Sequence, residues 1–139
     1  MAPRTTEEIM GHPNEAIVRK GYEAFSKGDT ETLQNEIFTE DIVWHVPGRN
    51  RLSGDYSGIS EVLGYFGQLG ELSAGSLQVT LEDVLANDER TVALHHATGT
   101  SAGKTLDDHE VLVFHFRGDK VSEARAHTEN QHAVDQFWS

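Results

Sequence analysis

Apolar residues recur at helical spacing near the beginning of the chain. They lie on one predicted stripe formed by Ile17, Gly21, Ala24 and Phe25. Pro13 favours the first turn of a helix, and Asn14 is a residue type that caps one. Gly28 can end the helix in a left-handed conformation. The pattern therefore predicts a helix over residues 14–28.

Two further helices are predicted before the middle of the chain. Asp29 can cap a short second helix that ends at residues 39–41. Its apolar residues are Leu33, Ile37 and Phe38. A third helix is predicted from Gly58 to about Leu72, because apolar residues there return to a spacing of three and four.

A change of period to two predicts strands. Residues 42–46 are mostly β-branched or aromatic and stop at Pro47, which indicates a short strand followed by a loop over residues 49–58. Four longer alternating segments follow: 77–86, 91–101, 106–116 and 120–128. The short turns between them require antiparallel neighbours. The i, i+4 pairs Ala133/Phe137 and Val134/Trp138 predict a last turn or two of helix.

The order of elements predicts an α+β fold. Helices come early and the long strands late, so helices and sheet are segregated. A long antiparallel sheet curls, and three helices on its concave side would form a cone-shaped barrel with a funnel inside. Funnels of this kind bind small molecules. We expect one domain over residues 14–139, preceded by a flexible leader over residues 1–13.

Composition excludes several classes of function. The 139 residues include 23 acidic and 11 basic side chains, for a formal net charge of −12, which argues against nucleic acid or an anionic membrane as partner. There is no cysteine, so disulfides, thiol nucleophiles and thiolate metal sites are excluded. The first 13 residues lack the apolar core of a signal peptide. We expect a soluble, cytoplasmic protein.

Several segments together resemble the nuclear transport factor 2-like superfamily, in its SnoaL-like and ketosteroid-isomerase-related branch. They are Tyr22–Asp29, Phe38–Gly48, Tyr56–Gly58, Val113–Val121 and Asp135–Trp138. The resemblance spans residues 14–139 and implies a ligand buried in the cone and a homodimer formed through the outer face of the sheet. This scaffold hosts isomerases, cyclases, hydrolases, dehydratases and non-catalytic binders, so the resemblance leaves the reaction open.

The chain departs from the ketosteroid isomerase pattern at three positions. That enzyme uses a carboxylate base, a tyrosine and a protonated aspartic acid. Aligned by its turns, this sequence has Gly21 in place of the tyrosine, Val46 in place of the base and Leu112 in place of the acid. We therefore expect no isomerase activity of that kind, and no cofactor.

The same alignment predicts which residues face the cone. Leu112 would point inward, and the period of two then brings Glu110 and Phe114 to the same face. On the neighbouring strand Leu94 and His96 would face in, but a register shift of one residue exchanges the two faces. The predicted ligand contacts are Tyr22, Phe25, Trp44, Val46, Tyr65, Phe66, Leu94, Leu112, Phe114 and Ala126.

His96 and Glu110 are the candidate catalytic pair. A carboxylate beside a histidine raises its basicity and orients it as a general base. The alternatives are that both belong to a polar network that satisfies a partly buried sheet, or that Glu110 simply faces water. An enzyme acting on an apolar carbonyl compound, a non-catalytic binder of a hydrophobic metabolite and a dimeric interaction module all stay open.

The chain has eight histidines, which raises the question of a metal site. The alternation of side chains along the strands allows only three of them to converge, on the outer face of the sheet: His45, His109 and His127. Adjacent histidines such as His95 and His96 point apart. We therefore expect no metal site, and we interpret the histidines as scattered surface or interface residues.

Overall fold

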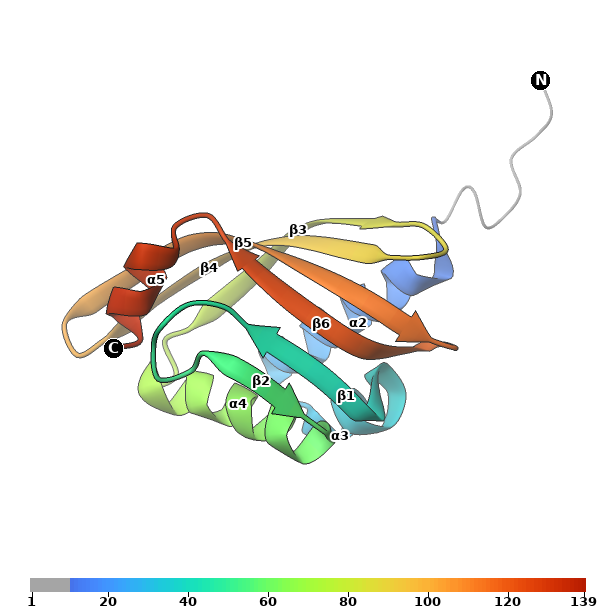
Figure 1. Cartoon of the computed structure of the whole chain (residues 1–139), viewed down its shortest axis with the longest axis horizontal. Helices are drawn as coiled ribbons and strands as arrows, with labels where there is room; N and C mark the ends of the chain where they lie inside the picture. The colour runs from blue at the N-terminus through green and yellow to red at the C-terminus, as the bar shows by residue number, and fades with distance from the viewer. Residues whose placement is uncertain (1–10) are drawn as a thin grey trace, which may run out of the picture.

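The computed structural model describes residues 11–139 and contains four α-helices, one π-helix and six strands (Figure 1). In chain order the elements are α2 (Pro13–Lys27), α3 (Thr30–Thr32), η1 (Leu33–Ile37), β1 (Phe38–Val46), β2 (Gly54–Ser57), α4 (Ile59–Leu72), β3 (Gln78–Ala86), β4 (Thr91–Ser101), β5 (Lys104–Arg117), β6 (Lys120–Thr128) and α5 (Gln131–Phe137). The predicted α+β fold is confirmed.

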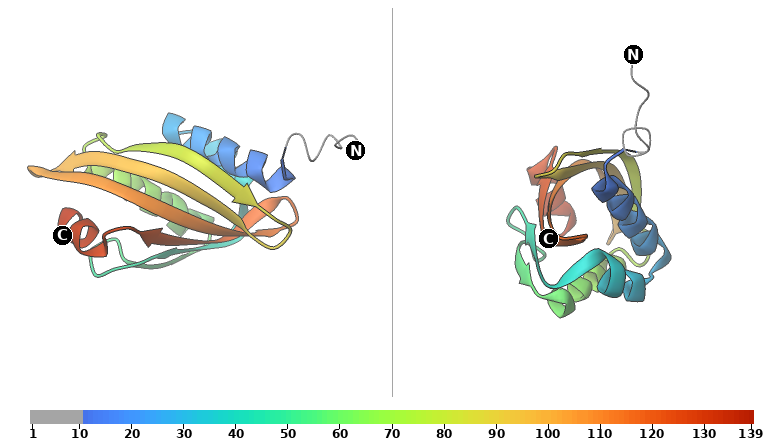
Figure 2. Two further views of the ribbon diagram at one scale, coloured as in Figure 1. Left: turned by 90° about the horizontal axis from the view of Figure 1, so that it is seen from above. Right: turned by 90° about the vertical axis from the view of Figure 1, so that its right-hand side faces the viewer.

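All six strands form one sheet in the order β2-β1-β6-β5-β4-β3. Only the β1–β6 pair is parallel, and the other four pairs are antiparallel. The sheet curls, and Figure 2 shows α2 and α4 lying on its concave side. The second half of the chain is the predicted meander of four antiparallel strands.

Two features of the sheet differ from the prediction. Strand β1 begins at Phe38 rather than at residue 42, because Phe38 already pairs with Val121 of β6. The expected loop over residues 49–58 contains β2, in which Tyr56 pairs with Trp44. Gly54 and Asp55 are poor strand formers, so this edge strand depends on its pairing with β1 rather than on propensity.

The N-terminal helices follow the prediction with two corrections. His12, not Asn14, caps α2, since its Nδ1 accepts a hydrogen bond from the Asn14 amide at 3.2 Å. Gly28 ends this helix with φ 69°, as predicted. The second helix closes as the π-helix η1 and passes directly into β1. Of the expected leader, residues 1–10 lie outside the described residues, and Pro13 is already the first residue of α2.

The main core lies between the helices and the concave face of the sheet. Ile42, Val62, Ala93 and Ala124 are completely buried there. Trp44 lies at the centre of an aromatic group, with ring-centroid distances of 5.1 Å to Phe66, 5.9 Å to Phe38 and 6.1 Å to Phe114. The near-perpendicular rings favour edge-to-face attraction, which holds β1, β5 and α4 together.

A second core cluster fixes the C-terminal helix. Leu52, in the loop before β2, packs with Phe137 and Trp138 and is only 1% exposed. Asp135 accepts hydrogen bonds from the Arg49 amide at 3.0 Å and from Asn50 Nδ2 at 2.8 Å. The loop and α5 thus close the end of the barrel opposite the β3–β4 turn (Figure 1).

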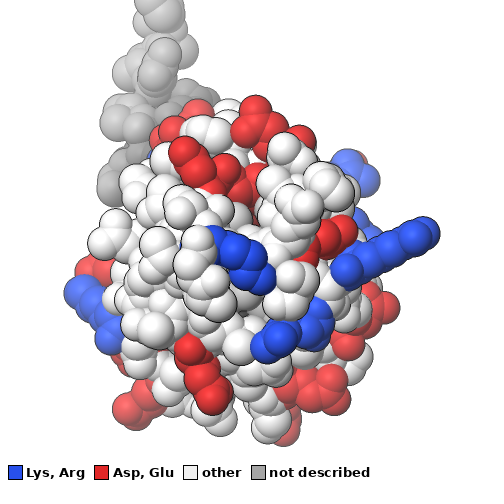
Figure 3. Space-filling view, turned by 90° about the vertical axis from the view of Figure 1, so that its left-hand side faces the viewer, with Lys and Arg blue, Asp and Glu red and all other residues white. Residues whose placement is uncertain are grey.

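Charge is distributed over the surface without a continuous basic region on the face seen in Figure 3. There the Lys and Arg side chains are separated by neutral and acidic surface. Within residues 11–139, every helix is too short or too polar to traverse a lipid bilayer.

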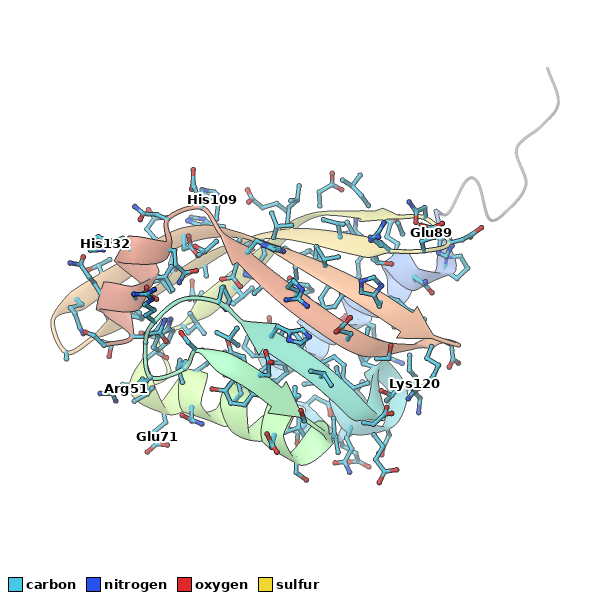
Figure 4. The ribbon with its side chains drawn as sticks, viewed as in Figure 1. Arg51, Glu71, Glu89, His109, Lys120 and His132 are labelled. Atoms are coloured by element: carbon cyan, nitrogen blue, oxygen red, sulfur yellow. The ribbon has the colours of Figure 1, made fainter. Side chains whose placement is uncertain are left out.

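Truncating Leu52 tests the second cluster. We expect Leu52→Ala to lower the free energy of unfolding by about 2–5 kcal/mol, because the lost side chain leaves a cavity between the loop and α5. Its neighbour Arg51 is exposed (Figure 4), and Arg51→Ala should change that free energy by less than about 0.5 kcal/mol. Urea denaturation of both variants measures the difference. Equal midpoints for the two would contradict the packing described.

Candidate functional site

A cavity of about 120 Å³ lies between the helices and the concave face of the sheet. One water needs roughly 10–15 Å³ by the same measure, so the space suits a small organic molecule or a group of waters. Most of the wall is apolar. Its residues are Val18, Gly21, Tyr22, Phe25, Leu33, Ile37, Phe38, Trp44, Tyr65, Phe66, Leu69, Leu77, Val79, His95, Ala97, Leu106, Glu110, Leu112, Phe114, Val121 and Trp138.

Three polar side chains form a row on this apolar wall. The hydroxyl of Tyr22, from α2, is 2.5 Å from Nδ1 of His95 on β4. On the other side of the imidazole, Nε2 lies 3.9 Å from Oε2 of Glu110 on β5. His95 and Glu110 are directly paired across the two strands, so their side chains point to the same face.

Burial sets the protonation of the row. The His95 side chain is 7% exposed, and loss of hydration lowers the pKa of its imidazole to about 4. Burial raises the pKa of Glu110 to about 8, helped by the negative charge of Asp108. At neutral pH the imidazole is therefore neutral and Glu110 mostly carries its proton.

Asp108 extends the polar surface along β5, two residues before Glu110. It is 3% exposed, and Oγ1 of Thr128 donates to its carboxylate at 2.6 Å. Burial raises the pKa of Asp108, while the hydrogen bond from Thr128 opposes that change. When Asp108 is ionised, its negative charge close to Glu110 favours the protonated form of Glu110.

Two tyrosine hydroxyls complete the set of hydrogen-bonding groups. Burial raises the pKa of Tyr22 and of Tyr65 well above the ordinary value, so both remain hydroxyl groups across the physiological range. The cavity therefore presents hydroxyl and carboxyl donors together with one neutral imidazole. This combination suits a ligand that carries a carbonyl oxygen on an apolar body.

The predicted orientation of β4 is wrong by one residue. His96 and Leu94 lie on the outer face, and His95 lies inside. The sequence contained a signal for this: the turn at Ala102–Gly103 pairs Ser101 with Lys104, and counting back from that pair reaches His95 opposite Glu110. His96 is opposite His109 instead, so the expected His96–Glu110 pair does not form.

Most other predicted ligand contacts line the cavity. They are Tyr22, Phe25, Trp44, Tyr65, Phe66, Leu112 and Phe114. Val46 and Ala126 belong to the packed core and do not reach the cavity wall. Sequence reasoning missed His95 and several apolar residues of the cavity wall, including Leu77 and Trp138. The contribution of each residue to ligand binding stays a prediction.

His45, His109 and His127 do not form a metal-binding group. His45 lies between Asp55 and Glu123, at 2.7 and 2.8 Å from their carboxylate oxygens. These hydrogen bonds raise the pKa of His45, with Glu123 contributing most. Both nitrogens of this imidazole thus already have carboxylate partners.

Comparison with known proteins identifies the family of this chain. The SnoaL-like domain model matches residues 18–124. Rv0034, an uncharacterised protein of Mycobacterium tuberculosis, is 31% identical over 124 residues, which cover 88% of this chain and 94% of that protein.

Solved structures share the fold over nearly the whole chain. Bal32a, from a soil-derived mobile gene cassette, is 38% identical with a TM-score of 0.88, covering 91% of this chain and 97% of its own. An NTF2-like protein from Burkholderia xenovorans is 23% identical with a TM-score of 0.78, covering 91% and 96%. A Jannaschia protein provisionally named a SnoaL-like polyketide cyclase is 20% identical with a TM-score of 0.75, covering 100% and 98%. The predicted superfamily and branch are confirmed.

The raised pKa of Glu110 predicts a pH dependence of stability. The folded chain holds this proton more tightly than the unfolded chain, in which the pKa returns to its ordinary 4.5. The resulting stabilisation is complete below pH 4.5 and is lost as the pH rises through about 8. His95 has the opposite pH dependence: its contribution to the stability of the fold is present above pH 6.5 and is lost as the pH falls to about 4.

Glu110→Gln isolates the contribution of Glu110. Between about pH 6 and pH 8, the free energy of unfolding of wild type should fall by about 1–3 kcal/mol more than that of the variant, because glutamine does not ionise. Thermal and urea unfolding across that range measure the difference. The matched control is Glu89→Gln, in the exposed β3–β4 turn (Figure 4), which should follow wild type. Parallel curves for wild type and Glu110→Gln would show that Glu110 ionises normally.

Proposed function

The chain belongs to the SnoaL-like family, and on that premise we propose that its cavity binds a small, apolar, carbonyl-bearing molecule and catalyses proton transfer on it without a cofactor. The observation that carries the proposal is the Tyr22–His95–Glu110 row on an otherwise apolar wall. An apolar wall binds the body of a ligand, and a few polar groups fix its orientation.

The protonation states assign complementary roles to two side chains. Protonated Glu110 donates a hydrogen bond to the carbonyl oxygen and stabilises the negative charge that develops there. The neutral imidazole of His95, with its own proton on Nδ1 and donated to the Tyr22 hydroxyl oxygen, accepts a proton at Nε2 from the carbon next to the carbonyl. Proton transfer of this type is a step shared by isomerases, cyclases and dehydratases, so the proposal concerns the step and not one product.

Tyr22 is a positioning residue in this scheme. Its hydroxyl is hydrogen-bonded to Nδ1 of His95 and meets the imidazole edge to face, with ring centroids 5.4 Å apart. This contact fixes the ring plane and leaves Nε2 directed toward Glu110. The reacting atoms of a ligand would therefore meet both groups at one end of the cavity.

Hydrogen–deuterium exchange of ketones tests the proposal. In D2O, wild-type protein should accelerate exchange at the α-carbon of apolar ketones such as 2-tetralone, as followed by NMR. His95→Phe keeps a ring of similar size but removes the base, and should slow the catalysed exchange by roughly 10²–10⁴-fold. Glu110→Gln should slow it as well, and kcat/KM of wild type should fall as the pH rises through about 8.

His115→Phe and Glu89→Gln are the matched controls, since neither residue lines the cavity. Both should retain the wild-type rate. Unchanged exchange in His95→Phe and Glu110→Gln would reject the assigned roles. Saturable ketone binding with no acceleration in wild type would reject catalysis and support the non-catalytic binder.

We also propose that the chain forms a homodimer through the outer face of the sheet. Aliphatic side chains follow one another across this face on three adjacent strands. They are Leu85, Val92, Leu94, Val111 and Val113. Val92 of β4 is paired with Leu85 of β3 and Val113 of β5. Leu94 of β4 is paired with Val111 of β5. Leu85 is 57% exposed, which is unusual for a large apolar side chain and favours a protein contact.

A charge on this aliphatic face should break the dimer. We expect wild type to sediment at twice the chain mass of 15.4 kDa and Val111→Asp to sediment at the chain mass, because a buried unpaired carboxylate opposes association. Ala133→Asp places the same charge on exposed α5 and should leave the dimer intact. Wild type at 15.4 kDa would contradict the proposed interface.

A further inference from the structure

Two histidines that the cavity does not use face each other on the outside of the sheet. His96 of β4 is directly paired with His109 of β5. Their imidazoles are stacked, with ring centroids 4.4 Å apart and planes only 7° apart. Figure 4 shows His109 on the outer side of the sheet. The sheet backbone thus holds two imidazoles side by side.

A carboxylate lies close to the two imidazoles. Asp107 lies two residues before His109 on β5, so its side chain projects from the same face. Its Oδ1 is 2.5 Å from Nε2 of His96. One ligand atom from each of His96, Asp107 and His109 lies within 4.8 Å of the other two. Among the described residues, this is the one group of His, Cys, Asp and Glu with that convergence.

Two imidazoles and one carboxylate are a ligand set for a transition metal. Imidazole nitrogen binds Zn²⁺, Ni²⁺ and Cu²⁺ in preference to Mg²⁺ or Ca²⁺. With bonds of about 2.0–2.1 Å, ligand atoms around a tetrahedral Zn²⁺ are roughly 3.3 Å apart. The side chains of Asp107 and His109 are 72% and 54% exposed, so small rotations that close the remaining distance meet little steric resistance.

The surroundings of the cluster favour a cation. Oε1 of Glu82, on β3, is 3.2 Å from Nδ1 of His109. Carboxylates in that position orient metal-bound imidazoles and raise their basicity. The formal net charge of −12 adds a long-range attraction for divalent cations.

We propose that His96, Asp107 and His109 form a binding site for a divalent transition metal on the outer face of β4 and β5, with water completing the coordination. The site lies beside the aliphatic residues of the proposed dimer interface, on the side toward the β4–β5 turn. The site is separate from the cavity, because His95 and Glu110 project from the opposite face of the same two strands. Bound metal links β4 to β5 and stabilises the folded chain by mass action.

Isothermal titration of tag-free, full-length protein with Zn²⁺ tests the site. We expect one Zn²⁺ per chain and a melting temperature that rises with Zn²⁺ concentration. His96→Ala and Asp107→Asn should each weaken Zn²⁺ binding by at least about tenfold. Loss of a residue that only hydrogen-bonds to a metal ligand already costs about that much affinity. Co²⁺ as a second probe should give a visible absorption band in wild type that both variants lose.

His132→Ala is the matched control, since His132 lies exposed on α5 (Figure 4) and does not belong to the cluster. It should bind Zn²⁺ like wild type. Zn²⁺ affinity that is unchanged in both His96→Ala and Asp107→Asn would overturn the proposal, as would the absence of binding to wild type. If His96→Ala does not fold, Asp107→Asn decides the question alone, because that side chain is 72% exposed and its loss leaves the fold intact.

Discussion

The register between β4 and β5 is the constraint on which the chemistry of this protein depends. A two-residue turn connects these strands, with positive φ at both central positions, 50° at Ala102 and 81° at Gly103. Such turns match the right-handed twist of the flanking strands and therefore fix their pairing. That pairing brings His95 opposite Glu110 and His96 opposite His109. A shift of one residue would exchange the two faces of β4.

The two faces of the same strand pair offer different environments to similar side chains. Inside, His95 and Glu110 have lost hydration, so burial favours the uncharged form of both. Outside, His96 and Asp107 are hydrated and close to other polar groups. We therefore propose that a histidine and a carboxylate transfer protons on one face and bind a metal on the other. Burial, not residue identity, makes this difference.

The cavity exists because aromatic side chains hold the sheet apart from the helices. Trp44, Phe66 and Phe114 meet edge to face and form a rigid wall. Small residues at Gly21 and Ala97 leave space opposite them. A polar row can persist on such a wall because His95 is neutral and hydrogen-bonded to Tyr22, and Glu110 is protonated, so neither side chain is a buried charge.

Local patterns along the chain were enough to predict the features that depend on neighbouring residues. The stripe of α2, its end at Gly28, the helix α4 and the alternation of β3 to β6 are all local patterns, and they were predicted. Glu110, Leu112 and Phe114 were placed correctly because one inward residue fixes the parity of its own strand. The inward face of β4 follows from the Ala102–Gly103 turn, a local signal that the alternation along the strand does not contain. The parallel β1–β6 pairing and the edge strand β2 emerge only in the folded structure. These features, like the altered pKa values of His95 and Glu110, arise from contacts between segments far apart in the chain, which no local periodicity encodes.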